Sequence, residues 1–347
     1  MLDKKLKVLV VDDSTIIRRI LSDILNSHPD IEVVGIAING KMALTQVEAL
    51  KPDVITLDVE MPFMNGLETL KELNKIKPTP TVMISSLTKR GAEVTIKALE
   101  LGAVDFITKP DNPEDFKHLK NDIINKVKSA SMAKKPIMGS VSTPKALVNI
   151  PAKRTISSIN NLKTVVIGSS TGGPQALKEV IPFLPKDLPA RFLVVQHMPP
   201  KFTEMFAQRL DKISELTVKE AKDGDMLEVG KVLLAPGNYH MNVEPNGKIS
   251  LNQEPSVWGV RPAVDITLGS AAKVYKQDLI CVILTGMGKD GSKGSEAVKK
   301  LGGFCIAEDQ STCIIYGMPK CVIDAGHADR IEPIHNVANA IVEAIYR

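Results

Sequence analysis

Aromatic side chains are scarce in this chain of 347 residues: they make up 4% of the sequence, and Trp258 is its one tryptophan. A protein that stacks single-stranded nucleic acid needs exposed aromatic residues, so the composition argues against that function. Long apolar runs are also missing, since stretches such as Val8–Val11 and Ile280–Leu284 are far shorter than the ~20 residues of a membrane span. We therefore expect neither nucleic-acid binding nor direct membrane insertion.

Cysteine is limited to four residues, and no two of them form a CxxC pair. The N-terminus has a short apolar stretch that runs directly into two acidic residues, whereas a secretory signal ends in small residues at a cleavage site. We expect a cytoplasmic protein with reduced thiols. The four cysteines are Cys281, Cys305, Cys313 and Cys321.

The net charge of +4 comes from one short segment. Residues 1–125 contain 16 Lys and Arg against 19 Asp and Glu, residues 164–347 contain 20 against 21, and residues 126–163 contain 8 basic residues and no acidic one. Neither flanking region has the charge of a nucleic-acid-binding domain. The basic segment is rich in Ser, Lys and Pro and lacks periodicity, which predicts a linker over residues 126–162. The alternative is an arm that docks to an acidic partner.

Short β-rich runs alternate with helical patterns in residues 1–125. This alternation predicts a flavodoxin-like α/β fold, in which a five-stranded parallel sheet is covered by helices on both faces. In such sheets the functional residues gather at the carboxyl ends of the strands. The predicted strands are residues 7–12, 33–37, 54–58, 81–86 and 104–108.

Polar side chains stand at those strand ends. Asp12 and Asp13 close the first strand and Asp58 closes the third. Converging carboxylates repel one another unless a cation lies between them, and oxygen ligands suit Mg²⁺. Ser86 closes the fourth strand and Lys109 follows the fifth, where a hydroxyl and an ammonium group would stabilise phosphoryl oxygens. Each aspartate alone is typical of a cap or turn; the ordered set predicts a magnesium-dependent phosphoryl site.

Residues 5–125 resemble a response-regulator receiver domain. The resemblance implies that a histidine kinase phosphorylates Asp58. The motifs that carry it are Val10–Ser14, Leu57–Pro62, Asn65–Gly66, Ser86 and Lys109–Pro110.

The same resemblance implies a role for several more residues of this region. It places Mg²⁺ on carboxylates and on one backbone carbonyl, and it implies a switch that responds to the phosphoryl group. The implied metal ligands are Asp12, Asp13, Asp58 and the backbone carbonyl of Glu60, and the implied switch residues are Ser86, Phe106 and Lys109.

The second region begins with an apolar run at residues 163–168 that is typical of a buried strand. The following segment, Gly168–Gly172, fits G-x-S-x-G with Ser170 at its centre. That pattern makes a sharp strand-to-helix turn that exposes the serine hydroxyl near a helix N-terminus. A plain glycine turn explains an isolated match equally well. A phosphate-binding loop is excluded because Gly173 is followed by Pro174 rather than Lys, and the glycine spacing of a dinucleotide fingerprint is absent.

A nucleophilic serine needs a base and an acid that orients the base. Among six histidines, His197 directly follows the predicted strand 191–196, which places it at the same sheet edge as Ser170. Asp290 lies in the Gly-rich loop after the strand 278–286. The residues alone favour Asp290 only modestly over Asp309, which also follows a strand. Asp265 and Asp324 remain further alternatives.

Residues 163–345 resemble the catalytic domain of chemotaxis-specific protein-glutamate methylesterases. The resemblance implies a mostly parallel, Rossmann-like doubly wound domain, taken as residues 163–347, and assigns the nucleophile to Ser170, the base to His197 and the acid to Asp290. This chain departs from the family pattern at Ser169 and Lys289, where the family often has Ala and Asn. The matching blocks are Ser169–Gly173, Gln196–Pro200, Leu233–Gly237, His240–Met241, Arg261–Asp265, Leu284–Gly291 and Tyr316–Pro319.

The implied substrate is a glutamate γ-methyl ester on methyl-accepting chemoreceptors, with deamidation of receptor glutamines as a second expected reaction. Backbone N–H groups near Thr171 and Met287 are the predicted oxyanion donors. No cofactor is expected for ester hydrolysis, and phosphorylation of the receiver is expected to uncover the Ser170 cleft. Two other functions stay open: a serine peptidase or lipase, and a phosphorylation-dependent binding module without catalysis.

Overall fold

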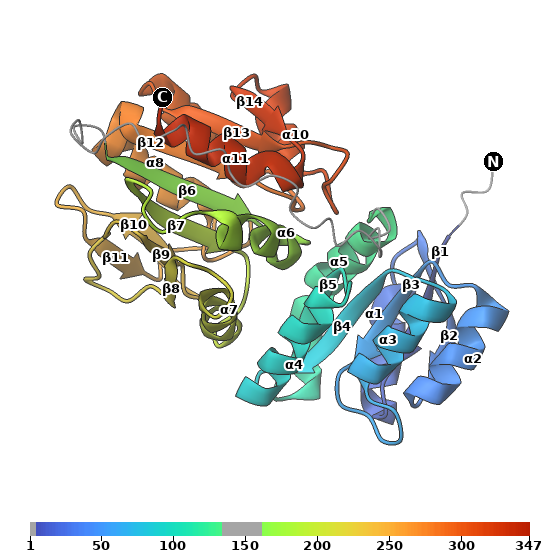
Figure 1. Cartoon of the computed structure of the whole chain (residues 1–347). Coiled ribbons are helices and arrows are strands. Elements are labelled where there is room, and N and C mark those ends of the chain that lie inside the picture. The colour runs from blue at the N-terminus through green and yellow to red at the C-terminus, as the bar shows by residue number, and fades with distance from the viewer. Residues whose placement is uncertain (1–4, 134–161) are drawn as a thin grey trace. The chain divides into compact units, whose positions relative to one another are not determined.

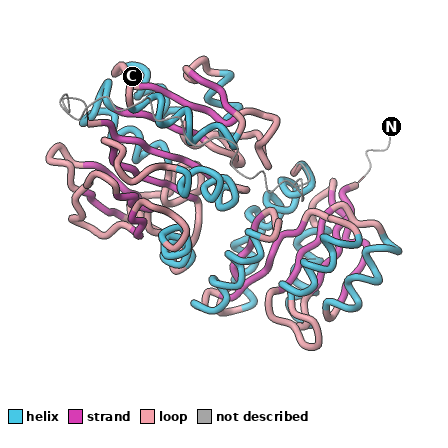
Figure 2. The backbone as a smooth tube through the Cα atoms, viewed as in Figure 1, coloured by secondary structure: helices cyan, strands magenta, loops and turns pink. Residues whose placement is uncertain are grey.

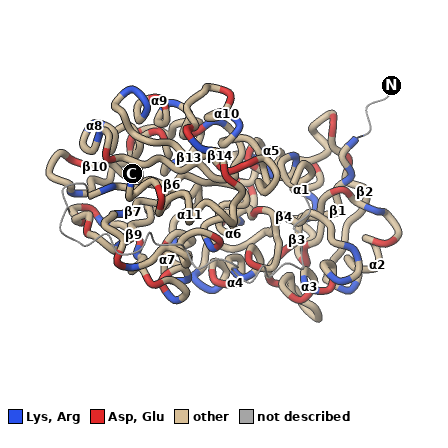
Figure 3. The backbone as a smooth tube through the Cα atoms, turned by 45° about the horizontal axis from the view of Figure 1, so that its top comes forward, with Lys and Arg blue, Asp and Glu red and all other residues tan. Residues whose placement is uncertain are grey.

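The chain divides into two compact units, Met1–Met138 and Gly139–Arg347. A computed structural model describes residues 5–133 and 162–347. Strands form the centre of each unit and helices surround them (Figure 1, Figure 2). Figure 3 shows Lys and Arg interspersed with Asp and Glu along both units, in line with the near-neutral balance of the two flanking regions. Over the described ranges, no helix is both long enough and apolar enough to cross a membrane.

The first unit contains a five-stranded sheet in the order β2-β1-β3-β4-β5. Each neighbouring pair of strands is parallel, which confirms the predicted flavodoxin-like topology. The interior strands are apolar on both faces because helices cover both. The strands are β1 (Leu6–Val11), β2 (Ile31–Ala37), β3 (Val54–Asp58), β4 (Thr81–Ser86) and β5 (Asp105–Lys109).

Side-chain caps mark where the helices of this unit begin. The side chains of Ser14, Asn39, Asn65 and Thr88 each accept a backbone N–H from the first turn of the following helix, which satisfies a donor that the helix itself cannot. The helices are α1 (Thr15–Asn26), α2 (Gly40–Leu50), α3 (Gly66–Ile76), α4 (Lys89–Glu100) and α5 (Lys120–Met132), with the 3₁₀ helix η1 (Pro113–Leu119) before α5.

Helix α5 runs further than the composition indicated. Residues 126–132, assigned above to the linker, are helical. Val127 and Ala130 are buried and continue the apolar face of Ile123 and Ile124 at helical spacing, a signal that the basic residues between them obscured. The remaining part of the predicted linker, residues 134–161, lies outside the described residues.

The second unit contains a seven-stranded sheet in the order β14-β13-β12-β6-β7-β9-β8, with every neighbouring pair parallel. A separate antiparallel hairpin joins β10 to β11. The predicted mostly parallel, doubly wound fold is confirmed. The strands are β6 (Lys163–Ser169), β7 (Ala190–Gln196), β8 (Thr217–Glu220), β9 (Lys231–Leu234), β10 (His240–Val243), β11 (Ile249–Asn252), β12 (Leu279–Ile283), β13 (Phe304–Glu308) and β14 (Arg330–Glu332).

Helices cover this sheet in two layers. Helix α6 contacts α11, and α8 contacts α9; Figure 1 shows α11 in front of the sheet and α8 behind it. The helices are α6 (Gly173–Val180), α7 (Phe202–Asp211), α8 (Val264–Tyr275), α9 (Ser292–Lys300), α10 (Met318–Asp324) and α11 (Ile334–Ile345), with the 3₁₀ helices η2 (Ile181–Phe183) and η3 (Lys276–Asp278).

Strand β6 lies at the centre of the sheet, between β12 and β7. The chain proceeds from β6 outward to β7 on one side and later returns to β12 on the other. A crevice forms at such a reversal of strand order, outside the carboxyl ends of the strands. The loops after β6, β7 and β12 therefore meet at one edge, and these loops carry the residues singled out from the sequence.

Candidate functional site

Three carboxylates gather at the carboxyl edge of the first sheet. Oxygens of Asp12, Asp13 and Asp58 lie within 4.8 Å of one another, and Asp12 and Asp58 are buried. The Nζ of Lys109 lies 2.8 Å from an oxygen of Asp12 and 2.8 Å from an oxygen of Asp58. When ionised, three carboxylates and one ammonium group leave two negative charges, so an all-oxygen donor set with this surplus fits a divalent cation such as Mg²⁺.

Burial and, to a smaller extent, the nearby charge of Asp12 raise the pKa of Asp58 to about 6, against the opposing effect of Lys109. Gly66 lets the chain return close to this aspartate, because a Cβ at that position would lie 2.1 Å from the backbone oxygen of Asp58. The backbone N–H of Glu60 donates to Asp58 Oδ1 at 3.3 Å. The metal-binding role of the Glu60 carbonyl stays a prediction.

The implied switch residues flank this site. The hydroxyl of Ser86 lies 3.1 Å from that of Thr88, the residue that caps α4. The side chain of Phe106 is buried. Lys126 holds this region from α5: its Nζ donates to the backbone oxygen of Phe106 at 2.7 Å and lies 5.4 Å from the centre of the phenyl ring. Lys126 is the first residue of the basic segment, and its composition gave no sign of this contact.

Ser170 follows β6 at a tightly constrained turn. Its backbone N–H donates to Thr285 O at 3.1 Å, and its backbone oxygen accepts from Gly173 N at 2.7 Å. Gly172 adopts a φ of +80° at the start of α6, a conformation that glycine tolerates without strain. A Cβ on Gly286 would lie 2.8 Å from the Cβ of Ser170, so the loop after β12 passes directly beside the serine.

His197 and Asp290 form a direct contact between the loops after β7 and β12. The Nε2 of His197 lies 2.8 Å from Oδ2 of Asp290. The side chain of His197 is 10% exposed and that of Asp290 2% exposed. Water therefore competes little for this contact, which strengthens it relative to a surface pair.

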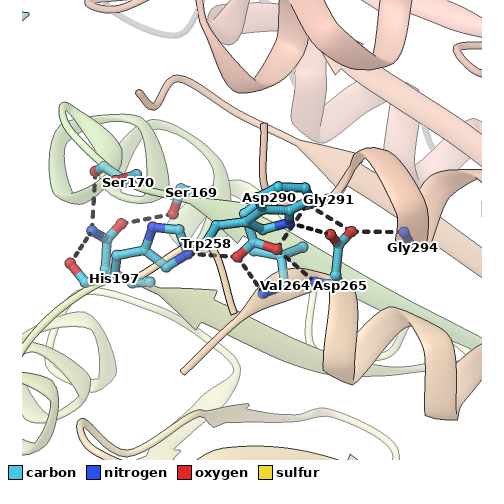
Figure 4. A network of polar contacts seen from close by, with 10 residues as sticks. Ser169, Ser170, His197, Trp258, Val264, Asp265, Asp290, Gly291 and Gly294 are labelled. Atoms are coloured by element: carbon cyan, nitrogen blue, oxygen red, sulfur yellow. Dashed lines mark hydrogen bonds and ion pairs between the residues drawn. The ribbon is translucent and has the colours of Figure 1, made fainter. Parts of the chain in front are cut away.

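The Asp290 carboxylate is held by the start of α8. Its Oδ2 accepts the backbone N–H of Val264 at 2.6 Å, and its Oδ1 accepts those of Asp265 at 2.9 Å and Gly291 at 3.0 Å. The positive end of the α8 dipole thus faces a negative side chain. These bonds, with the one to His197, fix the orientation of the carboxylate (Figure 4).

The contact with Asp290 determines which imidazole nitrogen can act as a base. A neutral histidine that donates Nε2–H to Asp290 leaves Nδ1 as the acceptor. His197 N donates to Ser169 O at 3.2 Å, and Ser169 pairs with Gln196 in the β6–β7 register, so Ser170 and His197 begin neighbouring loops.

One of the two side-chain hydrogen bonds of a Ser-His-Asp triad is formed, the one between His197 and Asp290. Among the described residues, no hydrogen bond joins the hydroxyl of Ser170 to His197, in contrast to the 2.8 Å contact between His197 and Asp290. Catalytic hydrogen bonds of this type are often long without substrate and shorten in the complex. The catalytic roles of Ser170, His197 and Asp290 therefore stay predictions that this arrangement supports.

The alternative acids lie in other environments. Asp309 Oδ1 accepts the backbone N–H of Ser311 within its own turn, at 2.8 Å. Asp324 pairs with Lys320 on α10. Asp265 supports the site without contacting the histidine: its Oδ1 accepts the backbone N–H groups of Gly291 and Gly294. Burial raises the pKa of Asp265, as does the charge of Asp290.

Two supporting residues were missed by the sequence analysis. Gln196 Oε1 accepts from Ser169 Oγ at 2.7 Å and its Nε2 donates to Ser170 O at 3.0 Å, which ties the two loops together. Glu308 Oε2 accepts the backbone N–H of Thr285 at 2.7 Å, and burial raises its pKa to about 7. Gln196 precedes His197 in a matched block, which was the available signal; Glu308 carried none.

The predicted oxyanion donors lie close to the serine. Thr171 directly follows Ser170 and is buried. Met287 directly follows Gly286, in the loop that passes beside Ser170. The role of their backbone N–H groups stays a prediction.

A receiver-like unit followed by a doubly wound unit with serine, histidine and aspartate at one edge defines a response regulator with a hydrolase as its output. The CheB methylesterase family model matches residues 165–341, and the response regulator receiver domain model matches residues 8–120. This chain belongs to the CheB methylesterase family. The family and the class of enzyme predicted from the sequence are thus confirmed.

Similar proteins match this chain along its whole length. A protein-glutamate methylesterase/protein-glutamine glutaminase of Symbiobacterium thermophilum is 48% identical over 99% of this chain and 98% of its own. The protein of the same name from Thermotoga maritima is 47% identical over 99% of this chain and 100% of its own. The crystal structure of the Thermotoga maritima CheB methylesterase catalytic domain covers 52% of this chain and 97% of its own, with 53% identity and a TM-score of 0.51.

Proposed function

We propose that this chain hydrolyses glutamate γ-methyl esters on chemoreceptors, deamidates receptor glutamines, and is activated by phosphorylation of its receiver unit. The observation that carries the proposal is the buried contact between His197 and Asp290 at the strand end beside Ser170. A histidine oriented by a carboxylate next to a serine on a tight turn is the arrangement that activates a nucleophilic hydroxyl.

In the acylation step, Nδ1 of His197 takes the hydroxyl proton as Ser170 Oγ attacks the ester carbonyl. The C–O bond to the methoxy group then breaks, and the imidazolium returns the proton so that methanol leaves. Asp290 keeps Nε2 protonated and stabilises the imidazolium formed between these steps. Two backbone N–H groups, proposed at Thr171 and Met287, would stabilise the oxyanion by roughly 3 kcal/mol per donor.

Deacylation repeats the chemistry with water. His197 Nδ1 takes a proton from water, the resulting hydroxide adds to the acyl carbonyl, and the bond to Ser170 Oγ breaks as the proton returns to that oxygen. The products are glutamate and the free serine. On glutamine the same acylation releases ammonia, so both reactions converge on one acyl-enzyme.

The receiver unit is the proposed regulator of ester hydrolysis. Asp58 is the proposed phosphoacceptor, and a chemotaxis histidine kinase is the proposed phosphodonor. Mg²⁺, when held by Asp12, Asp13 and Asp58, supplies charge neutralisation for phosphoryl transfer. Lys109, which contacts Asp12 and Asp58, would bind the phosphoryl oxygens, and Ser86 and Phe106 would transmit the change through β4 and β5.

The substrate determines the proposed location. Chemoreceptor methylation sites lie on cytoplasmic helices, so we propose that the chain acts in the cytoplasm at receptors already embedded in the membrane. The decisive experiment measures methanol release from methylated receptor membranes with and without a small phosphodonor. Donor-stimulated release by the wild-type chain, and none by Ser170→Ala, supports the proposal; release that is equal in both proteins contradicts it.

A further inference from the structure

The single tryptophan lies beside the candidate active site rather than in the core. Trp258 is 42% exposed and stands at a tight turn with a φ of +56°. Its indole Nε1–H donates to Asp265 Oδ2 at 2.8 Å. The other oxygen of Asp265 accepts from Gly291, the neighbour of Asp290, so one carboxylate connects the indole to the loop of the proposed catalytic acid (Figure 4).

Two lysines approach the face of this indole. The Nζ of Lys289 lies 4.0 Å from the ring centre and that of Lys293 lies 5.1 Å from it. Lys289 directly precedes Asp290, and Lys293 lies in the first turn of α9. Cation–π attraction holds an ammonium group over an indole most strongly of all aromatic rings. The ring thus gathers two positive charges at the loop that orients His197.

Within the part of the chain that the structure describes, these two charges have no anionic partner. Neither ammonium group forms an ion pair with any residue in the described ranges 5–133 and 162–347. Lys293 also lies at the N-terminus of its helix, where the dipole disfavours a cation. The indole offsets part of the repulsion between these two like charges, and a bound anion would neutralise the positive charge that remains.

The chemistry of the substrate provides that anion. Each hydrolysis or deamidation leaves a glutamate carboxylate on the receptor, so a receptor segment that still carries an ester gains negative charge as its other sites are processed. A carboxylate near the remaining ester would lie at the rim of the active site when that ester reaches Ser170. Lysines at the rim can attract such a group without taking part in the chemistry.

We propose that Lys289, Lys293 and Trp258 form a carboxylate-binding subsite, the rim subsite, which selects receptor segments with an acidic side chain next to the scissile ester. The inference rests on the proposed methylesterase function. The indole positions both ammonium groups, Asp265 positions the indole, and the two lysines are specificity-determining residues. The partner is the substrate itself, recognised by charge.

The test compares a charged with a neutral substrate. The variant is Lys289→Gln with Lys293→Gln in the full chain, activated by a phosphodonor. The substrates are methylated receptor membranes and a short uncharged peptide that carries one glutamate γ-methyl ester. We expect KM for the receptor to rise about fivefold at low ionic strength with kcat unchanged, and the increase to shrink in high salt. Turnover of the neutral ester should not change.

A matched control removes the same charge elsewhere. Lys248→Gln with Lys273→Gln changes two other exposed lysines of the same unit, and should leave KM for the receptor unchanged. An equal KM in the rim variant and in wild type overturns the subsite. An equal loss of activity on the receptor and on the neutral ester also overturns the subsite, because the lysines would then support the fold or the position of Asp290. Failure of wild type to release methanol from either ester would instead contradict the proposed function.

The variant Trp258→Leu tests the contribution of the indole ring separately from that of the two lysine charges. Without the ring the lysines lose their common anchor, so KM for the receptor should rise while hydrolysis of the neutral ester persists. Trp258→Phe keeps a ring but loses the bond to Asp265, and an intermediate KM is expected. A Trp258→Leu chain that binds the receptor as wild type does would remove the indole from the rim subsite.

Discussion

The Nε2 of His197 lies 2.8 Å from Oδ2 of Asp290, although 92 residues separate them in the sequence. The contact joins the ends of β7 and β12, the two strands that flank β6 in the sheet. It leaves Nδ1 as the nitrogen available to the loop of Ser170. The contact with Asp290 therefore leaves Nδ1 as the nitrogen at which the imidazole can accept a proton.

The nucleophile and base have the most direct test. We expect Ser170→Ala and His197→Ala each to lower methanol release by at least about 10³-fold, because either change removes proton transfer from the acylation step. Circular dichroism should show an intact fold, since both side chains lie at a loop edge rather than in the core. Near-normal turnover in either variant would remove that residue from the mechanism.

Asp290→Asn should be nearly as damaging as loss of the base. The amide NH₂ would face either His197 or the backbone N–H groups of Val264, Asp265 and Gly291, and donors cannot satisfy donors. We expect turnover to fall by about 10³- to 10⁴-fold with altered pH dependence. Asp309→Asn is the matched control, because its oxygen can still accept from Ser311. Equal losses in the two variants would argue against Asp290 as the acid.

Phosphorylation control predicts a loss of stimulation without a loss of basal activity. Asp58→Asn should hydrolyse methyl esters at the unstimulated rate with or without a phosphodonor. A fragment of residues 150–347, which belongs to the second compact unit, should be active without any donor if the receiver covers the cleft. A fragment as slow as the unstimulated full chain would contradict such coverage.

The raised pKa of Asp58 makes the stability of the receiver depend on pH. Because the folded pKa of about 6 exceeds the ordinary aspartate pKa of 3.8, protonation favours the folded state, and the stability that it contributes is lost as pH rises through 6. Asp58→Asn should therefore stabilise the first unit at pH 7 without Mg²⁺, by on the order of 1–3 kcal/mol. Hydrogen exchange in β1 and β3 measures this. The difference should vanish near pH 3.5, and persistence there would contradict the assignment.

Glu308 should act as a positioning residue for the loop beside Ser170. Its carboxylate accepts from Thr285 N, while Thr285 O accepts from Ser170 N, so Glu308→Ala loosens the segment that holds the serine. We expect about a tenfold lower kcat with little change in KM, and recovery in Glu308→Gln, which keeps an acceptor oxygen. A kcat unaffected by Glu308→Ala would show that Thr285 holds its place unaided.

Glu308 also predicts a pH dependence with a known sign. Its pKa of about 7 lies above the ordinary glutamate pKa of 4.5, so the stability from its protonated form is lost as pH rises through about 7. The unfolding free energy of Glu308→Gln should therefore fall less than that of wild type between pH 5 and 8. Parallel decreases in urea unfolding experiments would contradict this assignment.

Local patterns in the sequence predicted the five strands of the first sheet and the strands that precede Ser170, His197 and Asp290. The alternation of short apolar runs and amphipathic segments placed the strands around Asp58 and Ser170 because buried parallel strands must be apolar on both faces. The predicted linker began at residue 126, whereas helix α5 continues to Met132. The signal was weak because lysine and serine separate the buried residues Val127 and Ala130. Periodicity over one helical turn is weak wherever charged residues interrupt it.

The sequence by itself determined which residues stand at strand ends, and therefore that Ser170, His197 and Asp290 lie at one edge of the sheet. Its motifs also indicated the family. The tertiary structure decided which partners these residues have. Burial and the start of α8 direct the Asp290 carboxylate to Nε2 of His197, and Gln196 and Glu308 support the Ser170 loop from other strands. Such contacts depend on how side chains from distant segments pack against one another, and the local pattern of one segment does not specify them.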